Sequence, residues 1–196
     1  MPKEKPPKAE QPVMAFESAK TFEQWLETAH HEHQGIWLRI YKKGSNTPTI
    51  TYAEAVEVAL CFGWIDGQKN KHDDESWVQK FTKRGPKSVW SKVNVGHIER
   101  LTKEGRMRSA GFKTVEEAKA DGRWDKAYAS SSKAEMPEDF LNALNSNPKA
   151  KAFYGTLNKT NLYAIYYRIN SVKKAETRVR KIKEFVEMLE RGEKLH

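Results

Sequence analysis

The side chains best suited to chemistry lie in residues 81–94, which read FTKRGPKSVWSKVN. Five Lys or Arg residues and no Asp or Glu lie between positions 77 and 92. A helix is predicted to begin at Ser91, whose side chain would satisfy one free N–H group and leave others facing outward. Such a helix start suits a phosphate or carboxylate, and Trp90 offers a ring on which a base could stack. The residues predicted to bind this ligand here are Arg84, Lys87, Ser88, Trp90, Ser91, Lys92 and Asn94.

A second group of candidates lies in residues 60–67, which read LCFGWIDG. Trp64 and Asp66 follow a glycine turn and are expected near the basic strand, so both join the predicted ligand-binding set. Asp66 could orient Arg84 or act as a general base, which makes it the candidate catalytic residue. The alternatives are that Asp66 is a turn residue before Gly67, that Trp64 and Trp90 are core residues and that Ser91 is an ordinary helix cap.

The histidines and the single cysteine of the chain predict neither a metal site nor a cofactor. His30, His31 and His33 lie beside Glu32. Histidines at a helix end also complement the helix dipole, and no distant Cys or His completes a zinc ligand set. The sole cysteine, Cys61, falls in an apolar helical pattern and is expected to be a small buried residue.

The charge of the chain favours an anionic partner. Its 196 residues include 35 Lys and Arg against 26 Asp and Glu, which gives a net charge of +9 and a pI of about 9.5. Such an excess attracts nucleic acid, anionic small molecules or acidic membrane surfaces, although it can also serve solubility alone.

The C-terminal region carries the longest run of basic residues. Seven Lys or Arg residues and only Glu176 lie between positions 168 and 183. They surround a predicted apolar stripe made of Val179, Ile182, Val186 and Leu189. This helix could bind nucleic acid or a membrane surface, or it could pack its stripe inward and leave the charges in solvent.

The predicted elements indicate an α+β fold with a small, mostly antiparallel sheet, followed by an all-α C-terminal helical appendage. Capping patterns predict helices that begin at Thr21, Thr51 and Thr114, in addition to the one at Ser91. Alternating apolar residues predict strands at 36–40, 64–66 and 77–82. We expect a disordered tail at 1–14, an α+β domain at 15–125, a linker at 126–135 and a helical region at 136–192.

The chain is expected to be cytoplasmic. Its first residues, MPKEKPPK, lack the apolar core of a signal peptide. No run of 18 apolar residues is present, so no transmembrane segment is predicted. The oligomeric state does not follow from the sequence.

Several motifs resemble those of the YdeI/OmpD-associated family, also labelled bacteriocin-protection proteins. The resemblance rests on ALCFGWIDG at 59–67 and on the segment 81–94, with further matches at 99–101, 105–107, 110–111, 118–124 and 176–182. It extends from Phe16 to Leu189. The resemblance implies a role in tolerance of cationic antimicrobial peptides and in envelope stress, and it implies no catalytic residues.

Together these observations predict a stress protein that binds an anionic ligand at the basic helix start. Two alternatives remain open. In one, the chain is a small-molecule enzyme that uses Asp66 and Arg84 in a tryptophan-lined pocket. In the other, it is a module that binds nucleic acid or a membrane surface through the basic C-terminal helix.

Overall fold

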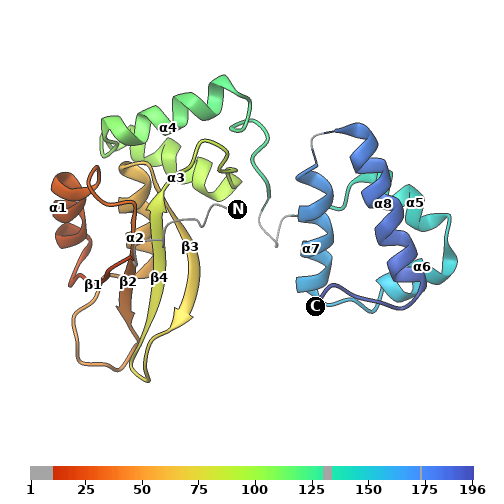
Figure 1. Ribbon diagram of the computed structural model, residues 1–196, viewed down its shortest axis with the longest axis horizontal. Coiled ribbons are helices and arrows are strands. Elements are labelled where there is room, and N and C mark those ends of the chain that lie inside the picture. Colours follow the sequence, from red (N-terminus) through yellow and green to blue (C-terminus); the bar gives the residue numbers. More distant parts are fainter. Residues whose placement is uncertain (1–10, 130–133, 173) are drawn as a thin grey trace, which may run out of the picture. The chain divides into compact units, whose positions relative to one another are not determined.

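The computed structural model describes residues 11–129, 134–172 and 174–196 of the chain. It divides into two units, which Figure 1 colours from red to green and from green to blue. The N-terminal unit comprises the residues up to Trp90 together with Asn94–Lys126, and the C-terminal unit comprises Ser91–Val93 and Ala127–His196. The fold combines a four-stranded sheet with helices, and the C-terminal unit contains helices, as the sequence predicted.

The N-terminal unit is built on a sheet with strand order β1-β2-β4-β3. The strands are β1 (Val13–Ala15), β2 (Gly35–Tyr41), β3 (Trp64–Lys71) and β4 (Ser76–Lys83). β1 runs parallel to β2, whereas β2, β4 and β3 pair in antiparallel fashion. The predicted strands are all present, and β3 continues well beyond position 66 because it pairs with β4 as far as Lys71.

β1 is an element that the sequence did not predict. It begins at Val13, inside the segment expected to be a disordered tail, because its backbone pairs with β2 and the Trp37 N–H donates to the Pro12 carbonyl. Residues 1–10 of the expected tail, and residues 130–133 of the expected linker, lie outside the described residues.

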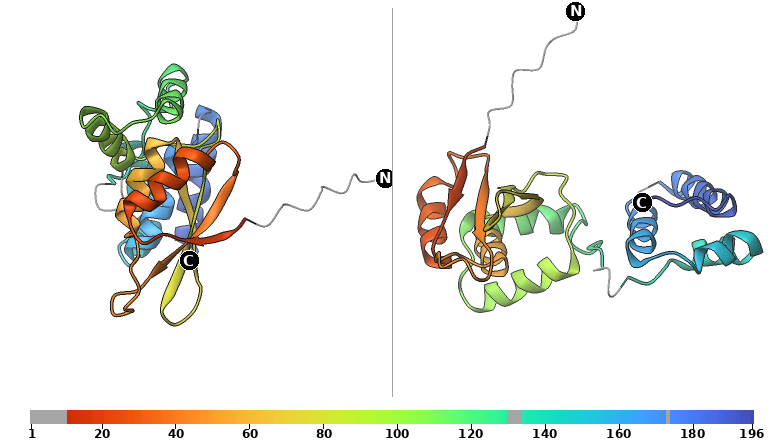
Figure 2. Two further views of the ribbon diagram at one scale, coloured as in Figure 1. Left: turned by 90° about the vertical axis from the view of Figure 1, so that its left-hand side faces the viewer. Right: turned by 90° about the horizontal axis from the view of Figure 1, so that it is seen from below.

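Two helices, α1 (Ala19–Ala29) and α2 (Tyr52–Cys61), lie side by side on one face of the sheet (Figures 1 and 2). The Thr51 capping box begins α2 as predicted. The cap of α1 is Ser18, and Thr21 is its reciprocal partner inside the helix, so the predicted start was one turn late. The ring of Phe22 packs against Phe81, which anchors α1 on the sheet.

Helices α3 (Lys92–Lys103) and α4 (Ser109–Ala120) complete this region of the chain. α4 begins five residues before the predicted cap at Thr114, whose hydroxyl instead donates to the Gly111 carbonyl within the helix. A Cβ at Gly111 would lie 2.2 Å from the Cys61 carbonyl oxygen, so only glycine allows α4 to approach the end of α2 this closely.

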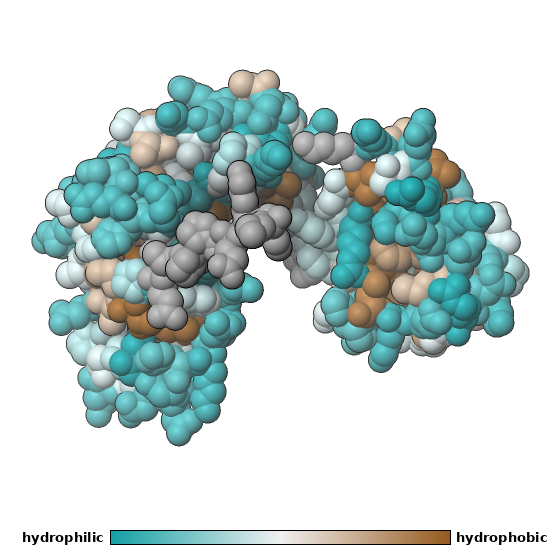
Figure 3. Space-filling model, in the orientation of Figure 1, coloured by the Kyte–Doolittle hydropathy of each residue, from teal (hydrophilic) through white to brown (hydrophobic). Residues whose placement is uncertain are grey.

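Ion pairs tie these helices together. Glu57 on α2 pairs with Arg100 and Arg106, and Arg108 pairs with Glu23 and Glu27 on α1. The apolar core beneath them includes Trp64, Trp90, Phe22, Phe81, Leu26, Leu60 and Leu101, all almost fully buried. The face shown in Figure 3 is mostly hydrophilic, in agreement with the low mean hydropathy of −0.83.

The C-terminal unit contains α5 (Glu138–Asn145), α6 (Pro148–Tyr154), α7 (Lys159–Asn170) and α8 (Ala175–Glu190). Figure 2 shows these helices from two further directions. Their buried apolar residues are Phe140, Leu144, Ala150, Ile165, Ile169, Ile182, Phe185 and Leu189. The predicted stripe of α8 is partly wrong: Val179 is 68% exposed, and Phe185 takes the central buried position. The buried face of α8 therefore runs through Ile182, Phe185 and Leu189, with Val186 only partly buried at its side.

Candidate functional site

Arg84 closes the loop that follows β4. Its backbone N–H donates to the Gly63 carbonyl at 2.9 Å, which places the side chain directly beyond the end of the sheet. The guanidinium lies 3.7 Å from the ring centroid of Trp90 and donates from Nη1 to Ser88 Oγ at 3.1 Å and to the Val89 carbonyl at 2.9 Å. Arg84 is only 8% exposed, so its charge is directed into the loop.

A second arginine holds the same loop. Arg123 donates from Nη1 to the Ser88 carbonyl at 2.9 Å, and its Nε pairs with Asp121 at 2.7 Å. The ring of Trp124 meets Trp90 edge to face at 4.9 Å. Two arginines and two tryptophans therefore hold the loop 84–90 in place, and Lys87 is exposed on it.

The predicted ligand-binding set is divided between the two units. Trp64, Asp66, Arg84, Lys87, Ser88, Trp90 and Asn94 belong to the N-terminal unit. Ser91 and Lys92 belong to the C-terminal unit, where Ser91 forms a β-bridge with Tyr128 and the Lys92 N–H donates to the Tyr128 carbonyl at 2.9 Å. α3 begins directly after Ser91 as predicted, but Trp64 is a core residue with no exposed surface.

Asp66 lies in the segment predicted to be a strand at 64–66, next to the basic strand β4. It is part of β3, before a bulge that separates it from Lys69, rather than in a turn. Among the described residues its carboxylate accepts a 2.6 Å hydrogen bond from the Tyr52 hydroxyl, and Arg84 is not its partner. The register of β3 and β4 places Asp66 opposite Phe81, on the face covered by α2, whose first residue is Tyr52.

Around this pair the sheet forms a polar corner that the sequence did not reveal. The ring of Trp77 lies 6.1 Å from that of Tyr52, and Lys69 Nζ lies 4.2 Å from the Trp77 centroid. A pocket of about 430 Å³ opens beside Tyr52, and its lining includes Lys43 and Thr47 from the loop after β2. The corner offers one carboxylate, one phenol and nearby cations, but Asp66 and Arg84 do not meet there.

Two of the other reactive residues singled out in the sequence, His30 and Cys61, are held within the fold. Within the described ranges no group of three His, Cys, Asp or Glu side chains could hold a metal ion. His30 Nδ1 lies 2.7 Å from the Leu26 carbonyl oxygen, which attaches the ring to the end of α1. Burial raises the pKa of the Cys61 thiol to about 11, so the thiolate needed for nucleophilic chemistry is scarce near neutral pH.

The cations of the C-terminal unit fall into two groups. Each basic side chain predicted to form a binding face on α8 has an acidic partner: Arg178 with Asp139, Arg180 and Lys181 with Glu184, and Lys183 with Glu187. On α6 and α7 and in the segment before α8 the situation is reversed. Over the described residues, none of the exposed cations there has an ion pair; they are Lys149, Lys151, Lys159, Arg168 and Lys174.

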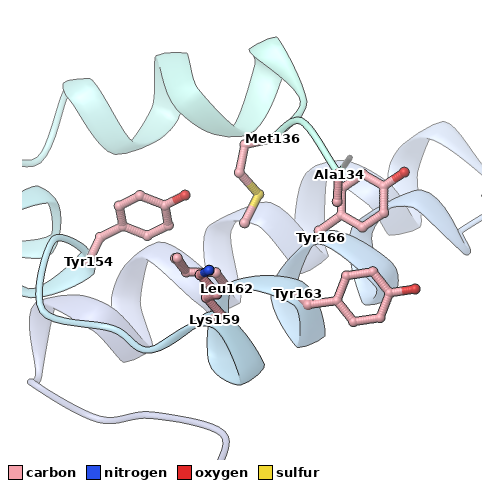
Figure 4. A pocket seen from close by; sticks show the side chains of 7 residues that line it. All are labelled: Ala134, Met136, Tyr154, Lys159, Leu162, Tyr163 and Tyr166. Atoms are coloured by element: carbon pink, nitrogen blue, oxygen red, sulfur yellow. The ribbon is translucent and has the colours of Figure 1, made fainter. Parts of the chain in front are cut away.

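One of these cations, Lys159, lines a pocket of about 530 Å³ between the segment before α5 and helices α6 and α7 (Figure 4). Three tyrosines line it together with aliphatic side chains and one lysine: Met136, Tyr154, Lys159, Leu162, Tyr163 and Tyr166. No sequence motif indicated this pocket, because its residues combine three separate segments. The spacing of Lys159, Tyr163 and Tyr166 on one helix was the available signal.

No helix of the described chain is both long enough and apolar enough to cross a bilayer.

Comparison with known families gave two matches. Residues 14–114, just over half of the chain, match a domain of unknown function (DUF8412). Residues 133–192 match the family described as bacteriocin-protection, YdeI or OmpD-associated. Curated proteins and solved structures gave no match. The chain therefore belongs to the DUF8412 family. The match over residues 133–192 supports the YdeI/OmpD-associated assignment with partial coverage, whereas the motifs at 59–67 and 81–94 lie within the DUF8412 match.

Proposed function

We propose that this chain is a stress protein of the bacteriocin-protection type and that it acts by binding an anionic partner rather than by catalysis. The C-terminal match supports the first part of this proposal. The observation that carries the second part is the distribution of unpaired charge. From position 140 to 175 the sequence has six Lys or Arg residues and no Asp or Glu.

The electrostatics favour this kind of partner. The residues of the C-terminal unit include 14 basic and 8 acidic side chains, a net charge of +6 out of +9 for the whole chain. A surface of this sign repels cationic peptides and attracts polyanions. Protection by direct capture of a cationic bacteriocin is therefore disfavoured, and binding of an anionic target is favoured.

The helix start predicted from the sequence is the weaker site for this partner. Arg84 is buried and bonded to Ser88 and Val89, so of the basic side chains predicted there only Lys87 and Lys92 are exposed. The basic helix α8 is also weak, because its cations are neutralised by neighbouring carboxylates. The cations on α6 and α7, which have no ion pair among the described residues, remain as the best-supported phosphate contacts.

Binding of a fluorescein-labelled 20-nucleotide single strand and of inorganic polyphosphate, measured across a salt series, tests the proposal. The substitutions Lys149→Glu, Lys159→Glu and Arg168→Glu remove three unpaired cations together. Each phosphate contact on a single strand contributes about −0.7 to the slope of log K against log salt concentration. Counted from a reference of about 1 M salt, the loss of three contacts weakens the association constant at about 0.15 M salt about 50-fold.

A matched control carries Arg180→Glu, Lys181→Glu and Lys183→Glu on α8, with the same change in net charge. We expect the control to weaken binding several-fold less than the first variant. Equal losses in both variants would show that only net charge matters, which would contradict a site on α6 and α7. Absence of binding to either polyanion would refute the proposed function.

A further inference from the structure

The pocket between the segment before α5 and helices α6 and α7, here called the tyrosine pocket, has the composition of a binding site for planar rings. Its volume of about 530 Å³ lies within the range of small-molecule sites. In Figure 4, Met136 extends from the segment before α5 between Tyr154 on one side and Tyr163 and Tyr166 on the other. Leu162 completes the apolar lining.

Two of the tyrosines form a fixed pair. The rings of Tyr163 and Tyr166 lie 5.8 Å apart with an interplanar angle of 25°, which is close to parallel. Both hydroxyls engage the backbone of Ala129: the Tyr163 hydroxyl donates to its carbonyl at 3.4 Å, and the Tyr166 oxygen accepts from its N–H at 3.3 Å. Because their polar ends are held in this way, the rings are positioned before any ligand arrives.

Charge restricts what the pocket can accept. Lys159 is exposed and lines the pocket, and among the described residues it has no acidic partner. Burial raises the pKa of Tyr154 and of Tyr163, so both phenols stay neutral near physiological pH and do not repel a phosphate. A cationic ligand would be repelled by Lys159, whereas an aromatic ring attached to an anion satisfies both the rings and the lysine.

We propose that the tyrosine pocket binds a nucleobase while Lys159 binds the attached phosphate. This chemistry is offered by single-stranded nucleic acid and by free nucleotides. Stacking of bases on aromatic side chains next to a basic track is the general mode of single-strand binding. The inference rests on the proposed function, because it names the class of anion that the unpaired cations attract.

Binding of the full chain to three probes separates the base from the phosphate. The probes are a labelled oligothymidylate, an abasic strand of equal length and a duplex of the same length. Loss of one stacking ring weakens single-strand binding about 5- to 100-fold. We therefore expect Tyr163→Leu to bring oligothymidylate binding down to the level of the abasic strand, and Tyr163→Phe, which keeps the ring, to preserve the difference.

Leu141→Ala is the control, since Leu141 is an exposed apolar residue of α5 that does not line the pocket. Thermal unfolding of each variant shows whether it is folded, and Tyr154→Leu offers a second position on α6 if Tyr163→Leu is not. Titration with thymidine monophosphate distinguishes the sources: saturable, Tyr163-dependent binding identifies a free nucleotide as sufficient, and binding of the strand alone identifies single-stranded nucleic acid.

The outcomes also separate this inference from the function on which it rests. If the abasic strand or the duplex binds as tightly as oligothymidylate and still depends on Lys149 and Arg168, the base pocket is overturned and the proposed function stands. If none of the probes binds, both fail.

Discussion

Replacing Arg84 by alanine decides whether this residue builds a loop or binds a ligand. Its guanidinium lies 3.7 Å from the Trp90 centroid and donates to Ser88 Oγ and the Val89 carbonyl. Hydrogen bonds from a charged donor contribute about 1.5–3 kcal/mol each, and a desolvated cation–π contact about 2 kcal/mol. Removing a buried charge also removes its unfavourable desolvation, so we expect Arg84→Ala to lower the free energy of unfolding by about 3 kcal/mol.

Urea unfolding followed by tryptophan fluorescence measures this change in the relevant part of the molecule. All six tryptophans precede position 127, so their fluorescence reports on the N-terminal unit. With a denaturant slope of about 2 kcal/mol/M, a loss of about 3 kcal/mol lowers the urea midpoint by about 1.5 M. Arg84→Lys keeps the charge but not the planar group, and we expect it to lose about 2 kcal/mol.

Lys87→Ala, at an exposed position of the same loop, serves as the control and should change stability by less than about 0.5 kcal/mol. The reasoning would be refuted if Arg84→Ala unfolded at the wild-type urea concentration while weakening the binding of polyphosphate. That result would restore Arg84 to the ligand-binding role predicted from the sequence.

Three further predictions follow from packing and titration. Gly111→Ala places a methyl group 2.2 Å from a backbone oxygen and should destabilise by more than about 3 kcal/mol in urea unfolding, whereas Gly96→Ala, in open space on a helix, should stabilise by about 0.5–1 kcal/mol. Because burial raises the pKa of Cys61 to about 11, its reaction with a disulfide reagent at pH 8 should be slow in the native protein and fast in urea; rapid labelling of the folded chain would contradict this burial. The hydrogen bond from Arg178 lowers the pKa of Asp139 below its usual value of 3.8, so the stability that it adds is present above that pH and is lost as pH falls through the lower native pKa. At pH 7, Asp139→Asn should therefore have a lower melting temperature than the wild type, with a loss of unfolding free energy of about 1 kcal/mol or less. Near pH 2 the two proteins should have the same melting temperature.

Local sequence patterns identified most of the elements. The capping box at Thr51 and the alternation at 36–40 are short-range features, and both elements are present where they were predicted. The errors also have local causes. Thr114 with Glu117 resembles a capping box, but in α4 the helix continues through it, because Gly111 lets the preceding turn pack against α2. β1 was missed because three residues carry too little periodicity to predict a strand.

The candidate site was predicted less well than the fold. Residue types alone suggested that Asp66 and Arg84 would meet, and the register of the strands separates them. Asp66 is instead paired with Tyr52, fourteen positions earlier, and Arg84 with its own loop. A basic residue is available to a ligand only when no acidic side chain of the folded protein pairs with it. The amino-acid composition does not indicate which basic residues are paired.

The sequence by itself determined the helices and strands, the net charge of +9 and the family resemblance, because periodicity, capping and composition depend on residues close together in the chain. Only the tertiary structure decided which polar groups are partners. It placed carboxylates beside the cations of α8, left those of α6 and α7 without an ion pair among the described residues, and gathered the tyrosines of two helices around one pocket. Such contacts arise when distant segments pack together, and no local pattern records which segments will meet.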